Sequence, residues 1–221
     1  MNANKAITQI ITVVSEDEKS GELKKILQLI NPSGTPVDVP KTIIFVARKS
    51  TCDNLANKMW NAGFPVDSLH GDKEQFQRTK VMDLFKKSQL RILVATDVAA
   101  RGLDVKDIAV IINFDFPVGP SSVEDYVHRI GRTARGDAEG KAFTFFTQSD
   151  AKSATQLIGV LERAEQQVPE ELRRLDRSGG TGGNGGNGGS GGRGGRRDSQ
   201  SGSGSGRGRG RGRGGGSGTK K

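Results

Sequence analysis

Short apolar runs alternate with segments of helical spacing along residues 1–176. Several runs are continuously apolar, such as "TIIFVA" at 42–47 and "AVIINF" at 109–114. Runs of this kind are typical of strands that are covered on both faces. The pattern predicts strands at 8–14, 42–47, 66–69, 91–95, 109–114 and 141–146.

The segments between these strands space their apolar residues three or four positions apart, which predicts helices. The predicted helices cover 20–30, 51–63, 74–88, 121–131, about 150–167 and 169–176, and residues 31–40 form a surface loop. Ser121 with Glu124 predicts a capping box, and Trp60, Phe64 and Phe85 are expected to pack in the core. Strands that alternate with helices predict an α/β fold, with a parallel sheet flanked by helices on both faces.

Composition separates the C-terminal end from the rest of the chain. Residues 177–221 contain ten Lys/Arg and one acid, Asp198, and so carry the whole net charge of +9, whereas 24 basic and 24 acidic residues balance in 1–176. Residues 178–221 hold 22 of the 32 glycines and no aliphatic or aromatic side chain. Such a segment has no apolar surface to offset its ordering entropy. The sequence therefore predicts a folded domain over 1–176 and a disordered basic Gly/Arg/Ser-rich tail over 177–221.

Several classes of site are excluded by what the sequence contains. Cys52 is the one cysteine, so a disulfide framework within the chain and a cysteine-based metal site are excluded. His70 and His128 are too far apart in sequence to suggest a metal site. No apolar run has the length of a membrane span, and the N-terminus shows no signal-peptide pattern. We expect a soluble, intracellular monomer with no membrane partner and no metal held by these residues alone.

Polar segments follow three of the predicted strands: "RKST" at 48–51, "HGDKEQFQR" at 70–78 and "TDVAARGLD" at 96–104. In parallel sheets, ligands bind outside the carboxyl ends of the strands, so these segments predict one binding edge. Gln75 and Arg78 are three apart near the start of a helix, where a phosphate is favoured. Gly71 would let that phosphate approach the backbone.

The segment "TDVAARGLD" offers further groups for a phosphorylated ligand. Arg101 directly precedes Gly102, so a positive charge stands next to a backbone position without a side chain. Thr96 could donate a hydrogen bond from its hydroxyl to a phosphate. Asp97 and Asp104 cannot bind phosphate directly, but they can accept from sugar hydroxyls, water or nearby basic residues.

A basic cluster stands in "YVHRIGRTARG" at 126–136. His128, Arg129, Arg132 and Arg135 recur every three or four residues, where like charges repel along a helix. Arg132 has no acid three or four positions away. Either the cluster is a solvated basic face, or Arg132 meets an anion from outside its own helix.

The motifs "HGDKEQFQR", "ATDVAARGLD" and "YVHRIGRTARG", in this order and spacing, resemble the second RecA-like domain of a DEAD-box RNA helicase. The resemblance covers about residues 7–147. It implies a RecA-like α/β domain that works with ATP and RNA. Two positions depart from the family pattern: Arg48 stands where Thr is frequent, and Ala134 where Gly is commoner.

The resemblance also implies a role for each matching residue. Arg132 would be the arginine finger on the γ-phosphate of ATP, with Arg135 beside it. ATP binding and its coupling to RNA would involve Asp104, His128, Arg129 and Gly131. The RNA backbone would contact Arg48, Gly71, Gln75, Arg78, Thr96, Asp97, Arg101 and Gly102.

The 221 residues contain neither a G-x-x-x-x-G-K-S/T loop nor the sequence DEAD. The resemblance therefore implies that ATP with Mg²⁺ binds between this domain and an N-terminal RecA-like domain, which mainly holds the Mg²⁺. The chain would be the second core domain of an ATP-dependent RNA helicase that unwinds duplexes locally, and it would be inactive alone. The alternative is a stand-alone, non-enzymatic RNA-binding or annealing protein that uses the basic tail.

The tail is a second candidate RNA-binding element. Cations that neutralise RNA phosphates release counterions, so its binding should weaken steeply with salt. The residues concerned are Arg193, Arg196, Arg197, Arg207, Arg209, Arg211 and Arg213. The tail resembles those of a nuclear branch of the family, which favours the nucleus over the cytoplasm.

Overall fold

A computed structural model describes residues 3–100, 105, 107–134 and 138–179. The chain divides into two units, Met1–Asn184 and Gly185–Lys221, and every described residue belongs to the first. The predicted tail over 177–221 therefore lies almost wholly outside the described residues.

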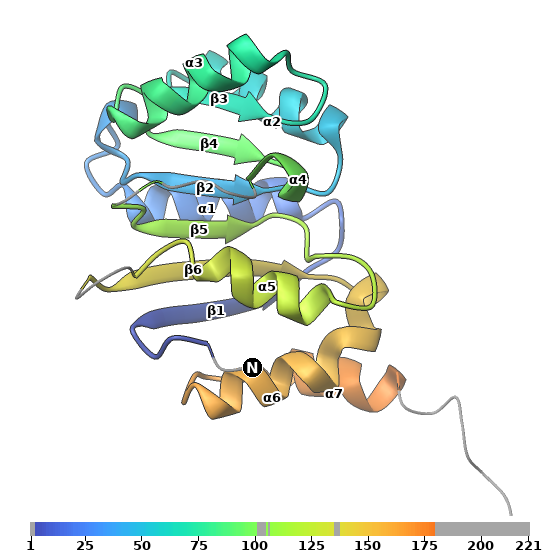
Figure 1. Cartoon of the computed structure of the whole chain (residues 1–221). Coiled ribbons are helices and arrows are strands. Elements are labelled where there is room, and N and C mark those ends of the chain that lie inside the picture. The colour runs from blue at the N-terminus through green and yellow to red at the C-terminus, as the bar shows by residue number, and fades with distance from the viewer. Residues whose placement is uncertain (1–2, 101–104, 106, 135–137, 180–221) are drawn as a thin grey trace, which may run out of the picture. The chain divides into compact units, whose positions relative to one another are not determined.

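A six-stranded sheet forms the centre of the described domain (Figure 1). The strands are β1 (Ile7–Val13), β2 (Thr42–Phe45), β3 (Val66–Leu69), β4 (Ile92–Ala95), β5 (Val110–Asn113) and β6 (Gly140–Phe146). Their order in the sheet is β1-β6-β5-β2-β4-β3, and all neighbours are parallel. All six predicted strands and the parallel arrangement are confirmed.

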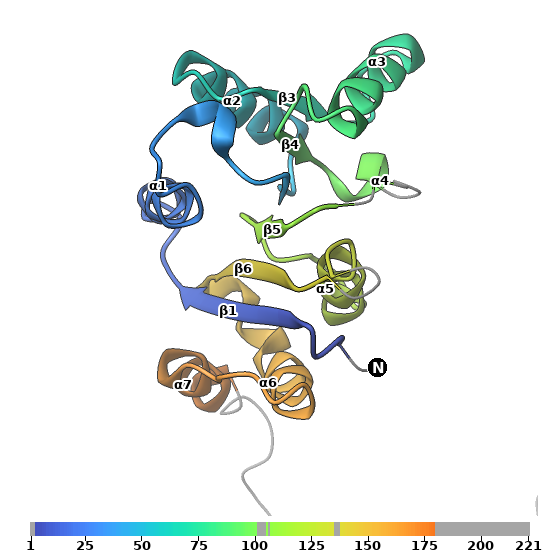
Figure 2. The same cartoon turned by 90° about the vertical axis from the view of Figure 1, so that its left-hand side faces the viewer.

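Helices cover both faces of the sheet (Figure 2). One face carries α1 (Lys19–Ile30) and α2 (Lys49–Asn61), and the other carries α3 (Gln75–Lys86), α4 (Asp97–Ala100) and α5 (Ser122–Ile130). Beyond β1 lie α6 (Ala154–Arg163) and α7 (Glu170–Gly179), and short 3-10 helices occur at Pro36–Asp38 and Gln148–Ser153.

The central strands are buried along their whole length because each face meets its own layer of helices. Ile44 of β2 packs in the core with Leu27 of α1 and Met59 of α2. Ile43, its neighbour in sequence, packs in the other core with Phe85 of α3. Successive side chains of a strand point to opposite faces, so a continuously apolar run supplies both cores.

Two local predictions were wrong, and one predicted helix starts differently. Ser121 precedes α5 but makes no side-chain cap hydrogen bond, so the predicted capping box does not form. The helix predicted from about residue 150 begins as a 3-10 turn, in which Thr147 N donates to Asp150 Oδ2 (2.8 Å). Trp60 is 62% exposed, because it lies outside the buried stripe of α2, whereas Phe85 is fully buried as predicted.

We predict that Ala134→Gly costs less stability than Ala56→Gly in α2, by about 1–2 kcal/mol. Both alanines are 6% exposed, but Ala134 has a φ of 53°, in the left-handed region that a Cβ disfavours. Glycine removes that strain, whereas it only loosens the helix at Ala56. Urea unfolding of the two variants gives the comparison, and equal losses would contradict strain at Ala134.

Candidate functional site

The carboxyl ends of all six strands meet at one edge of the domain, on the right in Figure 1. A cavity of about 230 Å³ opens at this edge, beside α4 and α5. Its lining consists of Phe45, Asp97, Ala100, Asp125, His128, Arg129 and Arg132. The cavity thus collects the acidic and basic groups of two predicted motifs that are about thirty positions apart in sequence.

Arg129 is the most constrained group in the cavity, with a side chain that is only 3% exposed. Its Nε donates to Asp97 Oδ1 and its Nη2 to Asp97 Oδ2, both at 2.6 Å, which makes a bidentate ion pair. Its Nη1 donates to the Asp115 carbonyl (2.7 Å) and to Asn113 Oδ1 (3.2 Å). The guanidinium carbon also lies 4.9 Å from the centre of the Phe45 ring. Arg129 therefore fastens α5 to the ends of β2, β4 and β5.

Asp115 extends this network to the opposite face of the sheet. Its Oδ2 accepts from the backbone N of Ala47 (2.8 Å), and its Oδ1 accepts from Nζ of Lys19 (2.7 Å), at the start of α1. Burial disfavours the charged amine, but the hydrogen bonds that Lys19 donates to Asp115 and Glu16 outweigh it and raise the pKa of Lys19. Lys19, at the start of α1, therefore stays charged where it bonds to Asp115.

Helix α5 is also anchored through its buried side. Tyr126 is fully buried, and its hydroxyl donates to Gln9 Oε1 of β1 (2.8 Å). His128 and Arg132, by contrast, are exposed and half-exposed and line the cavity, and Gly131 between them ends the helix. The structure thus brings together His128, Arg129 and Arg132, whereas Arg135 lies outside the described residues.

The residues predicted to contact RNA lie along the same edge. Arg48 is exposed directly before α2, and Gly71 is exposed in the loop after β3. Gln75 begins α3, and its Oε1 accepts from Nη1 of Arg78 (3.4 Å). Thr96 is buried at the end of β4, with its backbone N bonded to the Leu69 carbonyl (3.1 Å).

Some predicted residues cannot be placed, or are placed differently than expected. Arg101, Gly102 and Asp104 lie outside the described residues. Asp97 was assigned to RNA, but both of its carboxylate oxygens bond to Arg129. Asp97 thereby joins the segment after β4 to α5.

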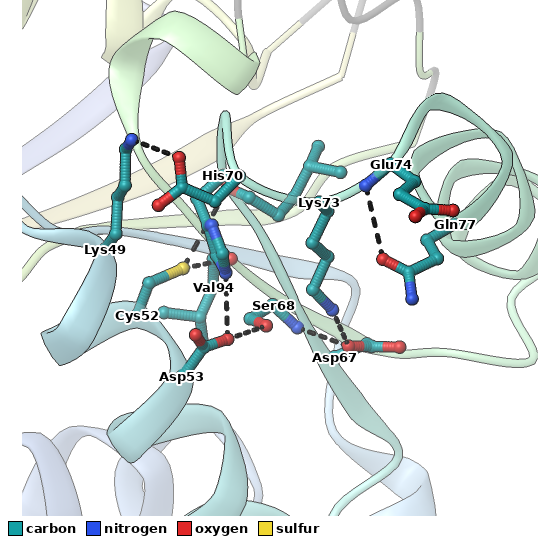
Figure 3. A network of polar contacts seen from close by, with 12 residues as sticks. Lys49, Cys52, Asp53, Asp67, Ser68, His70, Lys73, Glu74, Gln77 and Val94 are labelled. Atoms are coloured by element: carbon teal, nitrogen blue, oxygen red, sulfur yellow. Dashed lines mark hydrogen bonds and ion pairs between the residues drawn. The ribbon is translucent and has the colours of Figure 1, made fainter.

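A separate polar network holds the loop between β3 and α3 (Figure 3). Asp53 of α2 accepts from Ser68 Oγ (2.6 Å) and lies 3.0 Å from His70 Nε2. Partial burial would raise the pKa of Asp53, but these bonds from Ser68 and His70 outweigh it and lower the pKa below 3.8. The stabilisation is therefore present above pH 3.8 and is lost as the pH falls through the lowered pKa.

Two ion pairs complete the support of this loop. Lys49 in the first turn of α2 pairs with Asp72, and Lys73 Nζ donates to Asp67 Oδ1 (2.7 Å) (Figure 3). Cys52 beneath them is fully buried and donates to the Val94 carbonyl (3.1 Å), and burial raises its pKa to about 11. Cys52 is thus a neutral packing residue.

Sequence reasoning missed Asn113, Asp115 and Asp53, which orient other site residues. Asn113 left a signal, because it is the polar residue in the apolar run "AVIINF" and a buried amide needs a partner. Asp115 and Asp53 left none, since their partners come from distant segments. Among the described residues, no three His, Cys, Asp or Glu side chains gather as metal ligands. No helix in the described ranges is long and apolar enough to cross a membrane.

The helicase conserved C-terminal domain family matches residues 19–137 of the chain. The chain belongs to this family. Its helicase C-terminal domain is of the DEAD-box RNA helicase type. DEAD-box ATP-dependent RNA helicase 46 of Arabidopsis thaliana is 49% identical over 178 residues, which cover 80% of this chain and 26% of that protein. The probable ATP-dependent RNA helicase DDX17 of Mus musculus is 46% identical over 181 residues, 81% of this chain and 27% of that protein.

Solved structures agree with this assignment. The RNA helicase Prp28 from Chaetomium thermophilum, bound to ADP, superposes with a TM-score of 0.65 at 37% identity, over 77% of this chain and 40% of that one. Dbp5 of S. cerevisiae, bound to RNA and ADP BeF3, gives a TM-score of 0.62 at 26% identity, over 80% of this chain and 46% of that one. The fold is thus the RecA-like α/β fold, and this helicase domain spans about a quarter of the length of the curated relatives it matches.

We predict that Asp97→Asn destabilises the domain by roughly 2 kcal/mol, because a hydrogen bond to a charged group contributes about 1.5–3 kcal/mol. The substitution keeps the shape of the side chain but removes the charge that faces buried Arg129. Asp72→Asn is the matched control, since its ion pair with Lys49 is exposed and should contribute less than about 1 kcal/mol. Chemical unfolding measures the free energy of unfolding of both variants. Similar losses would show that the buried Asp97–Arg129 pair contributes no more to stability than the exposed Lys49–Asp72 pair.

Proposed function

We propose that this domain is the second core domain of an ATP-dependent RNA helicase. In this proposal Arg132 is the arginine finger, Arg135 acts beside it, and ATP lies between this domain and an N-terminal RecA-like domain. The observation that carries the proposal is the different placement of two arginines, one within α5 and one just after it. Arg129 is turned into the domain and bound to Asp97, while Arg132, three positions later, lines an edge cavity with His128.

The chemistry of the cavity suits a phosphate. Phosphoryl transfer spreads negative charge over the γ-phosphate oxygens, and a guanidinium with its fixed planar donors stabilises that charge. A rigid support for the arginine finger is required, because misplacement by about 1 Å can cost a hundredfold in rate. Arg129 and Tyr126 supply this support by fastening α5 to the sheet.

Mg²⁺ would be held mainly by the N-terminal domain. The acidic side chains at the cavity are Asp97, which is bonded to Arg129, and Asp125. When bound, the ion would neutralise phosphate charge during transfer. Asp104, His128 and Gly131 complete the proposed nucleotide side.

The RNA backbone would lie along the edge formed by the ends of β2, β3 and β4. Proposed contacts come from Arg48, Gly71, Gln75, Arg78 and Thr96, together with Arg101 and Gly102. The pair Asp97–Arg129 would link this RNA side to the nucleotide side, since it connects the segment after β4 with α5. Contacts to the backbone imply little sequence preference, and closure on bent RNA would open short duplexes locally.

The tail would add RNA affinity that depends on salt, through the seven arginines between Arg193 and Arg213. We also propose a nuclear location, on the resemblance of this tail to nuclear members of the family. The rival function, a stand-alone RNA binder or annealer, is not favoured by the comparisons, whose relatives are named as ATP-dependent RNA helicases.

We predict that the chain alone hydrolyses ATP at background, with or without RNA. Joined behind the N-terminal RecA-like domain of the Arabidopsis relative, in place of that protein's own C-terminal domain, it should hydrolyse ATP in an RNA-dependent way. Arg132→Ala in this chimera should lower kcat by roughly 10³-fold or more. Arg163→Ala, which removes an exposed arginine from α6, is the matched control and should change nothing. RNA-stimulated turnover by the chain alone, abolished by Arg132→Ala, would refute the proposal.

We predict that Gly71→Ala weakens RNA binding on the order of tenfold while leaving the melting temperature unchanged. A Cβ at this position would meet nothing closer than Lys49 Cε at 4.0 Å, so the folded domain accepts it. The added methyl group would instead occupy the space where a phosphate approaches the backbone. Fluorescence anisotropy with single-stranded RNA, at a salt concentration that suppresses binding by the tail, measures the effect. Unchanged affinity would exclude Gly71 from the RNA contact.

A further inference from the structure

Two aromatic side chains are exposed among the described residues, Trp60 at 62% and Phe76 at 76%. Trp60 is near the end of α2, away from the proposed RNA contacts, whereas Phe76 is the second residue of α3. A single exposed apolar side chain is ordinary on a protein surface, so exposure alone decides nothing. The location of Phe76 is the informative feature, because Gln75 precedes it and Arg78 follows two positions later.

Phe76 lies on the side of α3 that faces away from the core. Phe85 is nine residues later, which at 3.6 residues per turn is half a rotation around the helix, and it is fully buried against the sheet. The residues three and four positions after Phe76, Thr79 and Lys80, are exposed. The ring is therefore presented to solvent beside a lysine.

The start of α3 is a firm support for this ring. Gln77 Oε1 accepts from the backbone N of Glu74 (3.3 Å), which closes the first turn. The preceding loop is held by the His70–Asp53 contact and the Lys73–Asp67 and Lys49–Asp72 ion pairs (Figure 3). An aromatic side chain on an ordered turn loses little backbone entropy when a flat ligand stacks on it.

The charge around Phe76 favours an anionic ligand. The basic residues on this part of the edge are Arg48, Lys49, Lys73, Arg78 and Lys80, and the acidic ones are Asp53, Asp67, Asp72 and Glu74. Lys73 pairs with Asp67 and Lys49 with Asp72, which leaves the positive charges of Arg48, Arg78 and Lys80 outside these two pairs. An exposed aromatic ring gives a nucleotide base a surface to stack on, and the cations beside the ring can pair with the phosphates of the same strand.

We propose that Phe76 is an RNA-base contact, whose ring stacks on a base of the strand that the proposed function lays along Gly71, Gln75 and Arg78. The inference rests on that proposed function and adds a base-dependent contribution to an otherwise backbone-directed interface. Because every base has a flat face, this contact adds affinity for a base with at most a modest sequence preference.

The direct test places 4-fluorophenylalanine at position 76 of the full chain and follows its ¹⁹F resonance together with the backbone amide resonance of Gly71. The probes are a ten-nucleotide oligo(A) RNA and an abasic ribose-phosphate oligomer of the same length. We expect oligo(A) to shift both resonances and the abasic oligomer to shift that of Gly71 alone.

The other outcomes distinguish a failure of the Phe76 contact from a failure of the proposed RNA-binding function. If Gly71 responds but the fluorine does not, or if the fluorine responds equally to the abasic oligomer, Phe76 is no base contact and the RNA edge stands. If RNA binds and neither resonance moves, the proposed RNA edge fails together with the contact. If the fluorine in the chimera responds to an ATP analogue without RNA, the ring contacts the N-terminal domain, and the inference is overturned.

Affinity provides a second measurement. Phe76→Ala should weaken oligo(A) binding by about fivefold or more, the effect of losing one stacked base, and Phe76→Tyr should restore it. Trp60→Ala is the matched control, because it removes an exposed aromatic side chain from another part of the surface. The abasic oligomer should bind the wild-type chain and Phe76→Ala equally. A loss shared by Trp60→Ala, or one that Phe76→Tyr does not rescue, would overturn the assignment.

Discussion

The buried guanidinium of Arg129 is the constraint around which the carboxyl edge of the sheet is arranged. A charge that is removed from water must be paired and hydrogen-bonded, and removing one partner of such a pair is strongly destabilising. Arg129 meets this demand with the Asp97 carboxylate, the Asn113 amide and the Asp115 carbonyl. Three strand ends and one helix are thereby fixed relative to one another, which gives the cavity its shape.

The same constraint gives different positions to Arg129 in α5 and to Arg132, which follows the helix. Arg129, Arg132 and His128 all line the cavity, but the side chain of Arg129 is buried there, whereas His128 is exposed and Arg132 half-exposed. Asp97, in the segment after β4, bonds to Arg129 of α5, so each of the two motifs contributes one partner of this ion pair. In the proposed function, this ion pair would connect the nucleotide side of the domain with its RNA side.

The second rigid region is the loop between β3 and α3, which rests on Asp53 and on two ion pairs rather than on apolar packing. Short polar contacts hold backbone in place at the surface, where an apolar cluster would be exposed to water. Gly71, Gln75 and Phe76 are therefore presented from ordered backbone. In the proposed function, the nucleotide side is centred on α5 and the RNA side on the start of α3, and the ends of the intervening strands join them.

The sequence by itself determined the six strands, most of the helices, the parallel α/β class and the motifs of the edge, because hydrophobic periodicity and loop composition are local properties. It also carried a signal for Asn113 that pattern analysis missed, since an amide within an apolar strand needs a partner. Tertiary structure alone decided that Arg129 pairs with Asp97, that Ser121 does not cap α5, that Trp60 is exposed and that Asp115 reaches Lys19. These outcomes depend on which distant segments become neighbours in the strand order, and that order brings together groups for which spacing along the chain gives no signal.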